Sequence, residues 1–256
     1  MAGITDRTTP RAPAGSAGMF GGQSVGWSVC PLVLVAIVVA CTRPLGAQAP
    51  TPVAEWAGLD RYREENAKLP AAEPDRVVFM GNSITQAWAP LFPTLFPGRP
   101  YVGRGISGQT TAQMLVRFRQ DVIALHPAVV VILAGTNDIA GNTGPATLEE
   151  IQGNLASMTE LAQANGIRVV LCSVLPVFDY PWRPGLEPAP KIVALNAWLR
   201  RYAAERNAVY VDLHAAVRDE RDGMRTELAY DGVHPTEAGF RVMSPLVAQG
   251  ITAALR

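Results

Sequence analysis

The stretch Arg76-Val-Val-Phe-Met-Gly-Asn-Ser-Ile-Thr85 decides the fold of this 256-residue chain. Residues 77–80 form an unbroken apolar run rich in β-branched and aromatic side chains, which is typical of a strand buried on both faces. Gly81 ends the run, and Asn82 and Ser83 follow at the carboxyl end of the predicted strand. Ligands bind at that end of an open α/β sheet. Ser83 is therefore either a nucleophile or the N-cap of the next helix.

The rest of the chain alternates apolar runs with helical patterns. Besides the strand at 76–81, strands are predicted near Tyr101–Arg104 and over Ala128–Ala134, Arg168–Ser173 and Ala208–Leu213. Helices are predicted over 54–68, Thr110–Leu125, Leu148–Asn165 and Lys191–Arg206, and from Thr236 to the end. Strands that alternate with helices indicate a parallel sheet covered on both faces. We therefore expect the α/β class, as a three-layer α/β/α sandwich around a central five-stranded parallel sheet.

Composition and charge argue against several classes of protein. The 22 Lys and Arg residues balance 22 Asp and Glu residues, so the formal net charge is zero. Nucleic-acid binding needs a basic patch or stripe, so no nucleic-acid partner is expected. The three histidines share no helix face, so no metal site is expected either. The length suits one well-buried α/β domain.

Residues 1–49 are interpreted as an N-terminal region with a secretory signal peptide. The uncharged apolar run within 31–40 has the length of a signal core and is too short for a membrane span. Ala47-Gln-Ala49 has the small-x-small pattern of a cleavage site, and Val38-Val-Ala-Cys41 also resembles a lipoprotein signal that ends before Cys41. We expect an exported protein, periplasmic or extracellular, whose membrane contact is limited to the signal or a lipid anchor at Cys41. An uncleaved signal anchor is the alternative. Residues 50–73 are predicted to be a linker and an N-terminal helix.

Polar residues that packing does not require occur after three of the predicted strands and before the last predicted helix. They occur in the stretches Gly81–Ser83, Gly105–Thr110, Gly135–Asp138 and Asp231–Pro235. Each stretch alone is explained more simply by turns and helix caps. Four such stretches at strand ends or a helix start indicate a functional site.

The spacing of Asp231 and His234 is suited to acid–base chemistry. A carboxylate three residues before a histidine can reach the ring, fix its tautomer and leave Nε2 free to take a proton from a hydroxyl. A serine nucleophile also needs hydrogen-bond donors for the oxyanion. Gly108 can provide an unhindered backbone N–H, and Asn137 can provide a side-chain amide.

Taken in order, these stretches resemble the four sequence blocks of the SGNH (GDSL-like) hydrolases. The resemblance covers roughly residues 74–254, and its blocks are Gly81-Asn-Ser-Ile-Thr85, Ile106–Thr110, Gly135–Asp138 and Asp231-x-x-His234. It implies a flavodoxin-like strand order and a catalytic domain over 74–256. Members of the family are esterases, lipases, thioesterases and carbohydrate acetylesterases, and they work without a metal, so no cofactor is expected.

The resemblance also implies the role of each site residue. Ser83 would be the nucleophile, His234 the general base and acid, and Asp231 the residue that orients His234. The oxyanion hole would consist of the backbone N–H groups of Ser83 and Gly108 and the amide of Asn137. The chain would then be a serine esterase that acts on carboxylic esters through an acyl-enzyme.

One position departs from the pattern of the family. Asn82 stands where an aspartate usually precedes the serine. Asparagine keeps the size and a hydrogen-bond acceptor but loses the charge. We therefore expect activity with altered local hydrogen bonding.

Aromatic residues near these blocks are candidates for substrate binding. Tyr180 and Trp182 lie in the loop after the strand 168–173, and Trp88 lies just after Ser83. They would either form a substrate wall or pack the protein interior. The sequence shows no long apolar lid, so small esters with short acyl groups, including acetylated carbohydrates, are expected rather than triglycerides. The oligomeric state is not predicted.

Three other functions fit parts of the sequence. An acyltransferase would use the same triad with an acceptor other than water. A weakly active carbohydrate-binding module would retain the serine without turnover. The stretch Gly103–Gly108 spells G-x-G-x-x-G, but the acidic residue that a dinucleotide site needs at the tip of the next strand is missing.

Overall fold

The computed structural model describes residues 51–71 and 73–256. The predicted signal peptide, its cleavage site and Cys41 lie outside these residues. In the described part of the chain, no helix combines the length and apolar character that a membrane span requires.

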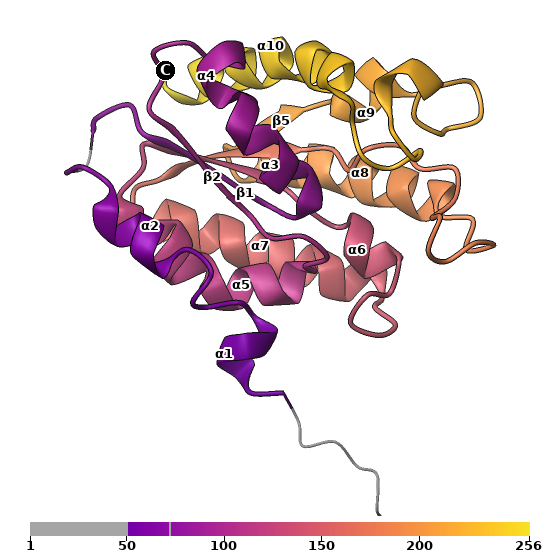
Figure 1. Ribbon diagram of the computed structural model, residues 1–256, viewed down its shortest axis with the longest axis horizontal. Helices are drawn as coiled ribbons and strands as arrows, with labels where there is room; N and C mark the ends of the chain where they lie inside the picture. The colour runs from indigo at the N-terminus through magenta and orange to yellow at the C-terminus, as the bar shows by residue number, and fades with distance from the viewer. Residues whose placement is uncertain (1–50, 72) are drawn as a thin grey trace, which may run out of the picture. The chain divides into compact units, whose positions relative to one another are not determined.

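Five parallel strands form the centre of the molecule (Figure 1). Their order across the sheet is β2-β1-β3-β4-β5, and every neighbouring pair is parallel. This is the flavodoxin-like order, so the predicted fold class and topology are confirmed. The strands are β1 (Val77–Gly81), β2 (Tyr101–Gly105), β3 (Val129–Leu133), β4 (Arg168–Cys172) and β5 (Val209–Val211).

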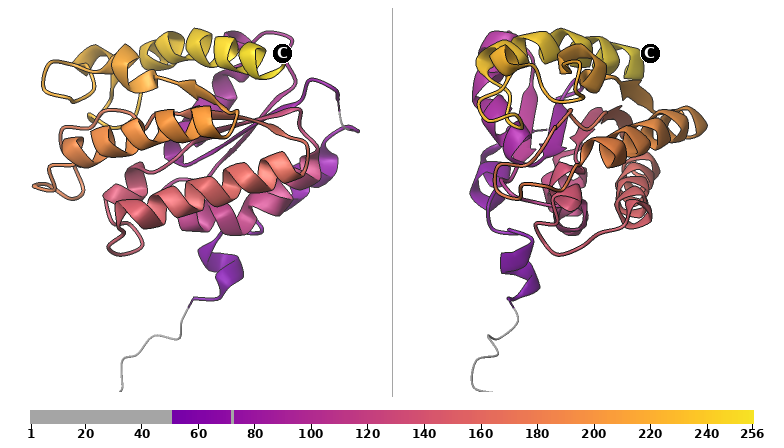
Figure 2. Two further views of the ribbon diagram at one scale, coloured as in Figure 1. Left: turned by 180° about the vertical axis from the view of Figure 1, so that it is seen from behind. Right: turned by 90° about the vertical axis from the view of Figure 1, so that its right-hand side faces the viewer.

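Helices cover both faces of this sheet, as the views in Figures 1 and 2 show. One face is covered by α5 (Thr111–Asp121), α7 (Leu148–Ala164) and α8 (Ala189–Glu205). The other face is covered by α3 (Ser83–Trp88), α4 (Phe92–Leu95) and α10 (Glu237–Ala254). Short elements connect these layers: α1 (Val53–Trp56), α2 (Arg63–Lys68), η1 (Ala89–Leu91), η2 (Ile123–Leu125), α6 (Thr136–Ile139), α9 (Leu213–Val217) and η3 (Thr226–Leu228).

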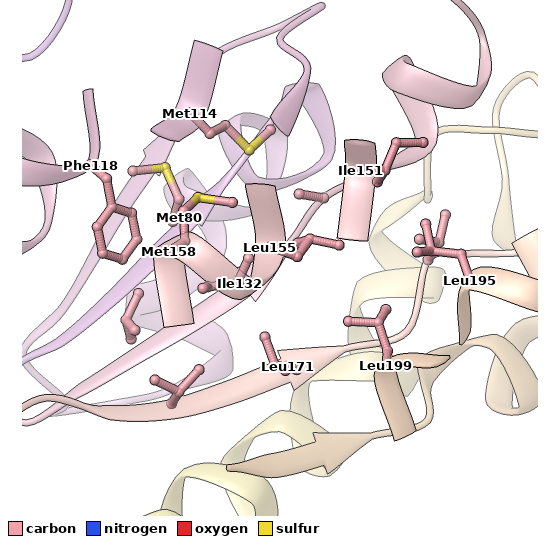
Figure 3. Close-up of a cluster of buried hydrophobic side chains, with 14 of the residues drawn as sticks. Met80, Met114, Phe118, Ile132, Ile151, Leu155, Met158, Leu171, Leu195 and Leu199 are labelled. Atoms are coloured by element: carbon pink, nitrogen blue, oxygen red, sulfur yellow. The ribbon is translucent and has the colours of Figure 1, made fainter. Parts of the chain in front are cut away.

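Alternate residues of each strand belong to two different cores. In β1, Val78 and Met80 pack with side chains of α5 and α7, whereas Val77 and Phe79 pack with side chains of α3, α4 and α10. All residues of β1 and β3 are buried, which explains their unbroken apolar runs. Figure 3 shows the first core, including Met80, Met114, Phe118, Ile132, Ile151, Leu155, Met158, Leu171, Leu195 and Leu199.

The prediction of a single helix over 54–68 is wrong. Two short helices, α1 and α2, are separated by a turn in which Gly58 adopts a φ of 64°, a left-handed conformation that interrupts a right-handed helix. The turn places the carbonyl oxygen of Ala57 2.8 Å from Gln109 Nε2, which donates to it. The hydroxyl of Tyr62 donates to the carbonyl oxygen of Gly105. These contacts with the β2–α5 connection determine the local conformation more strongly than helical periodicity does.

The predicted helix Thr110–Leu125 is also divided. The α-helix α5 ends at Asp121, the 3₁₀ turn η2 follows, and His126 adopts a left-handed φ of 48°. A residue before proline avoids the α-helical region, which explains why the chain leaves helical geometry before Pro127. The remaining predicted strands and long helices agree with the structure to within about two residues at each end, the usual uncertainty of element boundaries.

Candidate active site

Ser83 is the first residue of α3, and Asn82 alone separates it from the end of β1. The side chain of Asn82, not that of Ser83, caps the helix: Asn82 Oδ1 accepts the Ile84 N–H at 3.1 Å. The helix approaches β2 closely, since a Cβ atom at Gly105 would overlap the backbone of Gln86 and Asn82. The Ser83 hydroxyl is therefore available for other hydrogen bonds, and Asn82 provides the cap without a charge.

Asp231, His234 and Ser83 form a continuous chain of hydrogen bonds. Ser83 Oγ lies 2.9 Å from His234 Nε2, and His234 Nδ1 lies 2.8 Å from Asp231 Oδ2. The other oxygen of Asp231 accepts the backbone N–H groups of Val233 at 3.0 Å and His234 at 2.8 Å. The structure thus brings together side chains that are 151 positions apart in the sequence.

Electrostatics favour an ionised Asp231 in this arrangement. Partial burial opposes ionisation, but hydrogen bonds from the backbone and ring of His234 outweigh it and lower the pKa of Asp231. A carboxylate at Nδ1 favours the tautomer in which Nδ1 carries the proton. Nε2 is then an acceptor for the Ser83 hydroxyl.

The loop that carries Asp231 and His234 is folded back on itself before α10. Ala229 and Pro235 form an antiparallel bridge, and the Tyr230 N–H donates to the carbonyl oxygen of His234 at 2.9 Å. The Thr236 hydroxyl accepts the Gly239 N–H at 3.3 Å and caps α10. The imidazole is therefore positioned by a short closed loop at a helix start.

Gly108 and Asn137 lie in the same cavity as Ser83 and His234. The cavity has a volume of about 250 Å³, and its lining residues are Ser83, Ser107, Gly108, Asn137, Asn142, Trp182 and His234. Gly108 adopts a φ of 78°, which a residue with a side chain rarely adopts. Within 51–71 and 73–256, neither the Ser83 N–H nor the Gly108 N–H donates to a protein acceptor. Asn137 uses one amide hydrogen for the Gln109 carbonyl oxygen, at 2.9 Å, and has a second.

The predicted aromatic residues occupy different environments. Trp182 lines the cavity, is 42% exposed, and has its ring centroid 6.1 Å from that of His234. Trp88 is only 1% exposed and stacks on Phe240 in the core, so its predicted contact with substrate is wrong. Tyr180 is fully buried behind Trp182 and donates to the Thr136 carbonyl oxygen at 2.9 Å, so its predicted contact with substrate is also wrong.

Two side chains next to the site were not predicted. Asp138 accepts hydrogen bonds from Thr111, the first residue of α5. Asn142 donates to the Gly108 carbonyl oxygen at 3.1 Å and accepts from Trp182 Nε1 at 3.3 Å. Asp138 lies within the recognised Gly135–Asp138 stretch, but no periodic signal shows which way a turn side chain points. Asn142 carries no sequence signal at all.

Within the described residues, no other feature forms a second catalytic, metal-binding or dinucleotide-binding site of the kinds weighed from the sequence. A larger cavity of about 430 Å³, between α8 and the segment after β5, contains His214 and none of the predicted site residues. Among residues 51–71 and 73–256, no cluster of three His, Cys, Asp or Glu side chains is arranged to hold a metal ion. Gly103 and Gly105 of the G-x-G-x-x-G stretch lie inside β2, not in a phosphate-binding turn.

Comparison with known proteins identifies the family. The model of the GDSL-like lipase/acylhydrolase family matches residues 79–242, so the chain belongs to this family of hydrolases. Esterase TesA of Pseudomonas aeruginosa is 29% identical over 163 residues, which cover 62% of this chain and 75% of TesA. An acetylxylan esterase of Xylanibacter ruminicola is 26% identical over 221 residues, which cover 72% of this chain and 45% of that protein.

A solved structure supports the same assignment. The crystal structure of a GDSL-like lipase from Bacteroides thetaiotaomicron superposes with a TM-score of 0.75 and 46% sequence identity. The match covers 78% of this chain and 100% of that one. The protein is therefore an acylhydrolase by family, with an esterase among its relatives.

Proposed function

We propose that this protein is a serine esterase that hydrolyses carboxylic esters with short acyl groups, above all acetyl esters. The observation that carries the proposal is the hydrogen-bonded chain from Asp231 through His234 to Ser83. A serine hydroxyl is a weak nucleophile unless an adjacent base takes its proton during attack. His234 Nε2 is within hydrogen-bond distance of that proton, and Asp231 orients the ring.

These contacts support a reaction in two halves, acylation of Ser83 and hydrolysis of the acyl-enzyme. Ser83 Oγ attacks the ester carbonyl carbon while His234 Nε2 takes the hydroxyl proton, and Asp231 stabilises the resulting imidazolium. The oxyanion accepts hydrogen bonds from Ser83 N–H, Gly108 N–H and the Asn137 amide. The imidazolium then protonates the leaving alcohol. In the second half, His234 Nε2 takes a proton from water while the water oxygen attacks the acyl carbonyl carbon. The imidazolium then gives that proton to Ser83 Oγ as the bond between Oγ and the acyl carbon breaks, which releases the acid and restores the Ser83 hydroxyl.

The size of the cavity and its single large apolar side chain favour an ester with a small acyl group. Most of its lining side chains are polar, and Trp182 is the only large apolar side chain among them. A long acyl chain would need a continuous apolar surface, whereas an acetyl group does not. The exposed indole of Trp182 offers a flat face on which a sugar ring can lie. An acetylated carbohydrate fits these features, and one relative is named an acetylxylan esterase.

The test uses Ser83→Ala and a fluorophosphonate probe, which labels an activated serine covalently. The wild-type chain is expected to be labelled and to hydrolyse nitrophenyl acetate faster than longer esters. Ser83→Ala is expected to lose both properties while its thermal unfolding is unchanged. Labelling that persists in Ser83→Ala would identify another nucleophile, and absence of labelling in the wild type would refute the proposal.

A second assay identifies the natural substrate and the group that accepts the acyl group. Acetate release from acetylated xylan and pectin is expected, with water as the acceptor. If added alcohol increases the yield of an alkyl ester and decreases the yield of free acid, the protein would instead be an acyltransferase that uses the same triad. Binding of the polysaccharide without acetate release would favour a carbohydrate-binding module.

We further propose that the protein is exported. The apolar run within 31–40 and the Ala47-Gln-Ala49 pattern support signal processing. N-terminal sequencing of the mature protein distinguishes cleavage after Ala49 from processing before Cys41. Incorporation of labelled palmitate that depends on Cys41 would indicate a lipid anchor.

A further inference from the structure

Asp138 is a buried carboxylate that forms no ion pair with any residue of 51–71 or 73–256. Asp138 is only 4% exposed. Burial raises its pKa to about 6, hydrogen bonds from Thr111 oppose this shift, and no cation among the described residues contributes to it. A charged group in such a place costs stability at neutral pH, which a neutral residue of the same shape would avoid. Packing therefore does not account for a carboxylate at this position.

Its hydrogen bonds join α6 to the start of α5. Both carboxylate oxygens lie 3.0 Å from the Thr111 backbone nitrogen, and Oδ1 lies 2.5 Å from Thr111 Oγ1. Asn154 on α7 donates to the same Oγ1 at 3.0 Å, which directs the hydroxyl proton of Thr111 toward Asp138. The N–H of Thr111 belongs to the first turn of α5 and has no acceptor within its helix. Asp138 therefore determines where α5 and the residues before it lie.

The same two segments carry the proposed oxyanion donors. Asn137 donates to the Gln109 carbonyl oxygen at 2.9 Å, and Asn142 donates to the Gly108 carbonyl oxygen at 3.1 Å. Together with the contact at Thr111, these bonds join the 108–111 segment to the α6 region at three residues. A relative shift of the two segments would change the distance between the Gly108 N–H and the Asn137 amide.

We propose that Asp138 is a positioning residue of the esterase reaction, whose carboxylate holds the Gly108 N–H and the Asn137 amide at the spacing that the oxyanion requires. This inference rests on the proposed function, because the spacing matters only if an oxyanion forms there. Donors aimed at an oxyanion act mainly in the transition state, so their misplacement lowers kcat more than it changes KM.

The first experiment compares Asp138→Asn with the wild type, using nitrophenyl acetate and kcat per active site titrated with a fluorophosphonate. Asparagine keeps the shape and one acceptor oxygen, but it puts an NH2 donor in place of the second oxygen, which lies 3.0 Å from the Thr111 backbone nitrogen, so that two donors face each other there. A misplacement of about 1 Å costs on the order of 100-fold in rate, so kcat is expected to fall about 10- to 100-fold. KM is expected to stay within a factor of about three, as a transition-state effect requires.

Variants of Thr111 test whether the carboxylate acts through this residue. Thr111→Ser keeps the hydroxyl and is expected to retain wild-type kcat, whereas Thr111→Val removes it and is expected to lower kcat. In the double variant Asp138→Asn/Thr111→Val, the loss is expected to be smaller than the product of the single losses, because both remove the same contact.

Ser244→Ala is the matched control for a merely structural role. It removes a buried hydrogen bond with Trp88 Nε1, 3.1 Å long, in the other core. This variant is expected to lower Tm and to keep kcat per titrated site, whereas Asp138→Asn is expected to lose kcat with no fall in Tm at pH 8.

Any one of three results would overturn the proposal about Asp138. In the first, Asp138→Asn has a kcat per titrated site within twofold of wild type. In the second, Thr111→Ser and Thr111→Val have equal kcat, and in the third, the losses in the double variant are fully multiplicative. The failure of the proposed function is seen separately, as a wild-type chain without Ser83-dependent labelling or ester hydrolysis, and it would overturn this inference as well.

Discussion

The guanidinium group of Arg117 donates a hydrogen bond to the carbonyl oxygen of Gly81, 3.0 Å away and two residues before Ser83. The same group donates to Gln109 Oε1 at 2.6 Å, next to Gly108, and pairs with Asp121 at 3.1 Å. Both charged side chains are fully buried. One side chain beneath the sheet edge therefore joins the turn that carries the serine to the segment that carries Gly108.

Arg117→Met is expected to destabilise the protein strongly. The substitution leaves the Asp121 carboxylate buried without its partner, which costs about 3–5 kcal/mol. Urea unfolding measures the loss. Arg200→Met is the control, because the pair of Arg200 with Asp212 is exposed and a pair of that kind contributes about 0–1 kcal/mol. Equal losses in the two variants would contradict the importance of the buried pair.

Asn137→Ala is expected to lower kcat about 100- to 1,000-fold, the effect of removing one oxyanion donor. Asn142→Ala provides the comparison, since Asn142 also lines the cavity and donates to a carbonyl oxygen of the neighbouring segment. Its loss removes no proposed oxyanion donor, so a fall of less than about tenfold is expected. Steady-state kinetics with an acetyl ester distinguish the two. A fall of less than about tenfold in Asn137→Ala would remove Asn137 from the proposed oxyanion hole.

Two tryptophans are expected to respond in opposite ways to replacement by alanine. Trp88→Ala removes a buried ring of the core and is expected to cost about 3–5 kcal/mol of stability. Trp182→Ala changes a half-exposed residue at the cavity and is expected to leave Tm nearly unchanged while KM for an acetylated xylo-oligosaccharide rises. An unchanged KM would refute a contact between Trp182 and the sugar.

Asp138 is expected to make stability depend on pH. Its pKa is raised from 3.8 to about 6 in the folded protein, so its contribution is most favourable below pH 4 and is lost as the pH rises through 6. A difference of about two pKa units corresponds to about 3 kcal/mol. Asp138→Asn is therefore expected to gain stability relative to wild type between pH 4 and pH 8. Denaturant unfolding at the two pH values measures the gain, and a pH-independent difference would contradict it.

Much of the fold could be predicted because a doubly buried strand needs apolar side chains on both faces. The runs at 77–80 and 128–134 have no polar side, and they form the central strands β1 and β3, whose residues are all buried. Site residues at strand ends could be located for a related reason: parallel strands bring their carboxyl ends to one edge of the sheet. The order of the sequence blocks then identified Ser83, His234 and Asp231 as a set.

Other features could not be predicted from periodicity. Gly58 interrupts an amphipathic pattern because the turn there is stabilised by contacts with Gln109, on a segment about fifty residues away. Trp88 follows the Ser83 block, and Trp182 lies in the loop after a strand. Trp88 is buried in the core, whereas Trp182 borders the cavity. Asp138 lies beside Asn137, but its acceptor role depends on where α5 begins.

The sequence by itself determined the five strands and the positions of the long helices, and which residues are able to do acid–base and nucleophilic chemistry, because apolar periodicity and side-chain chemistry are local properties. Only the tertiary structure decided where the individual side chains point. Asn82 caps α3 in place of Ser83, Tyr180 is buried behind Trp182, and Asp138 joins the two proposed oxyanion segments. The physical reason is that the direction of a turn side chain is set by contacts with distant segments, and no single stretch of sequence contains both partners of such a contact.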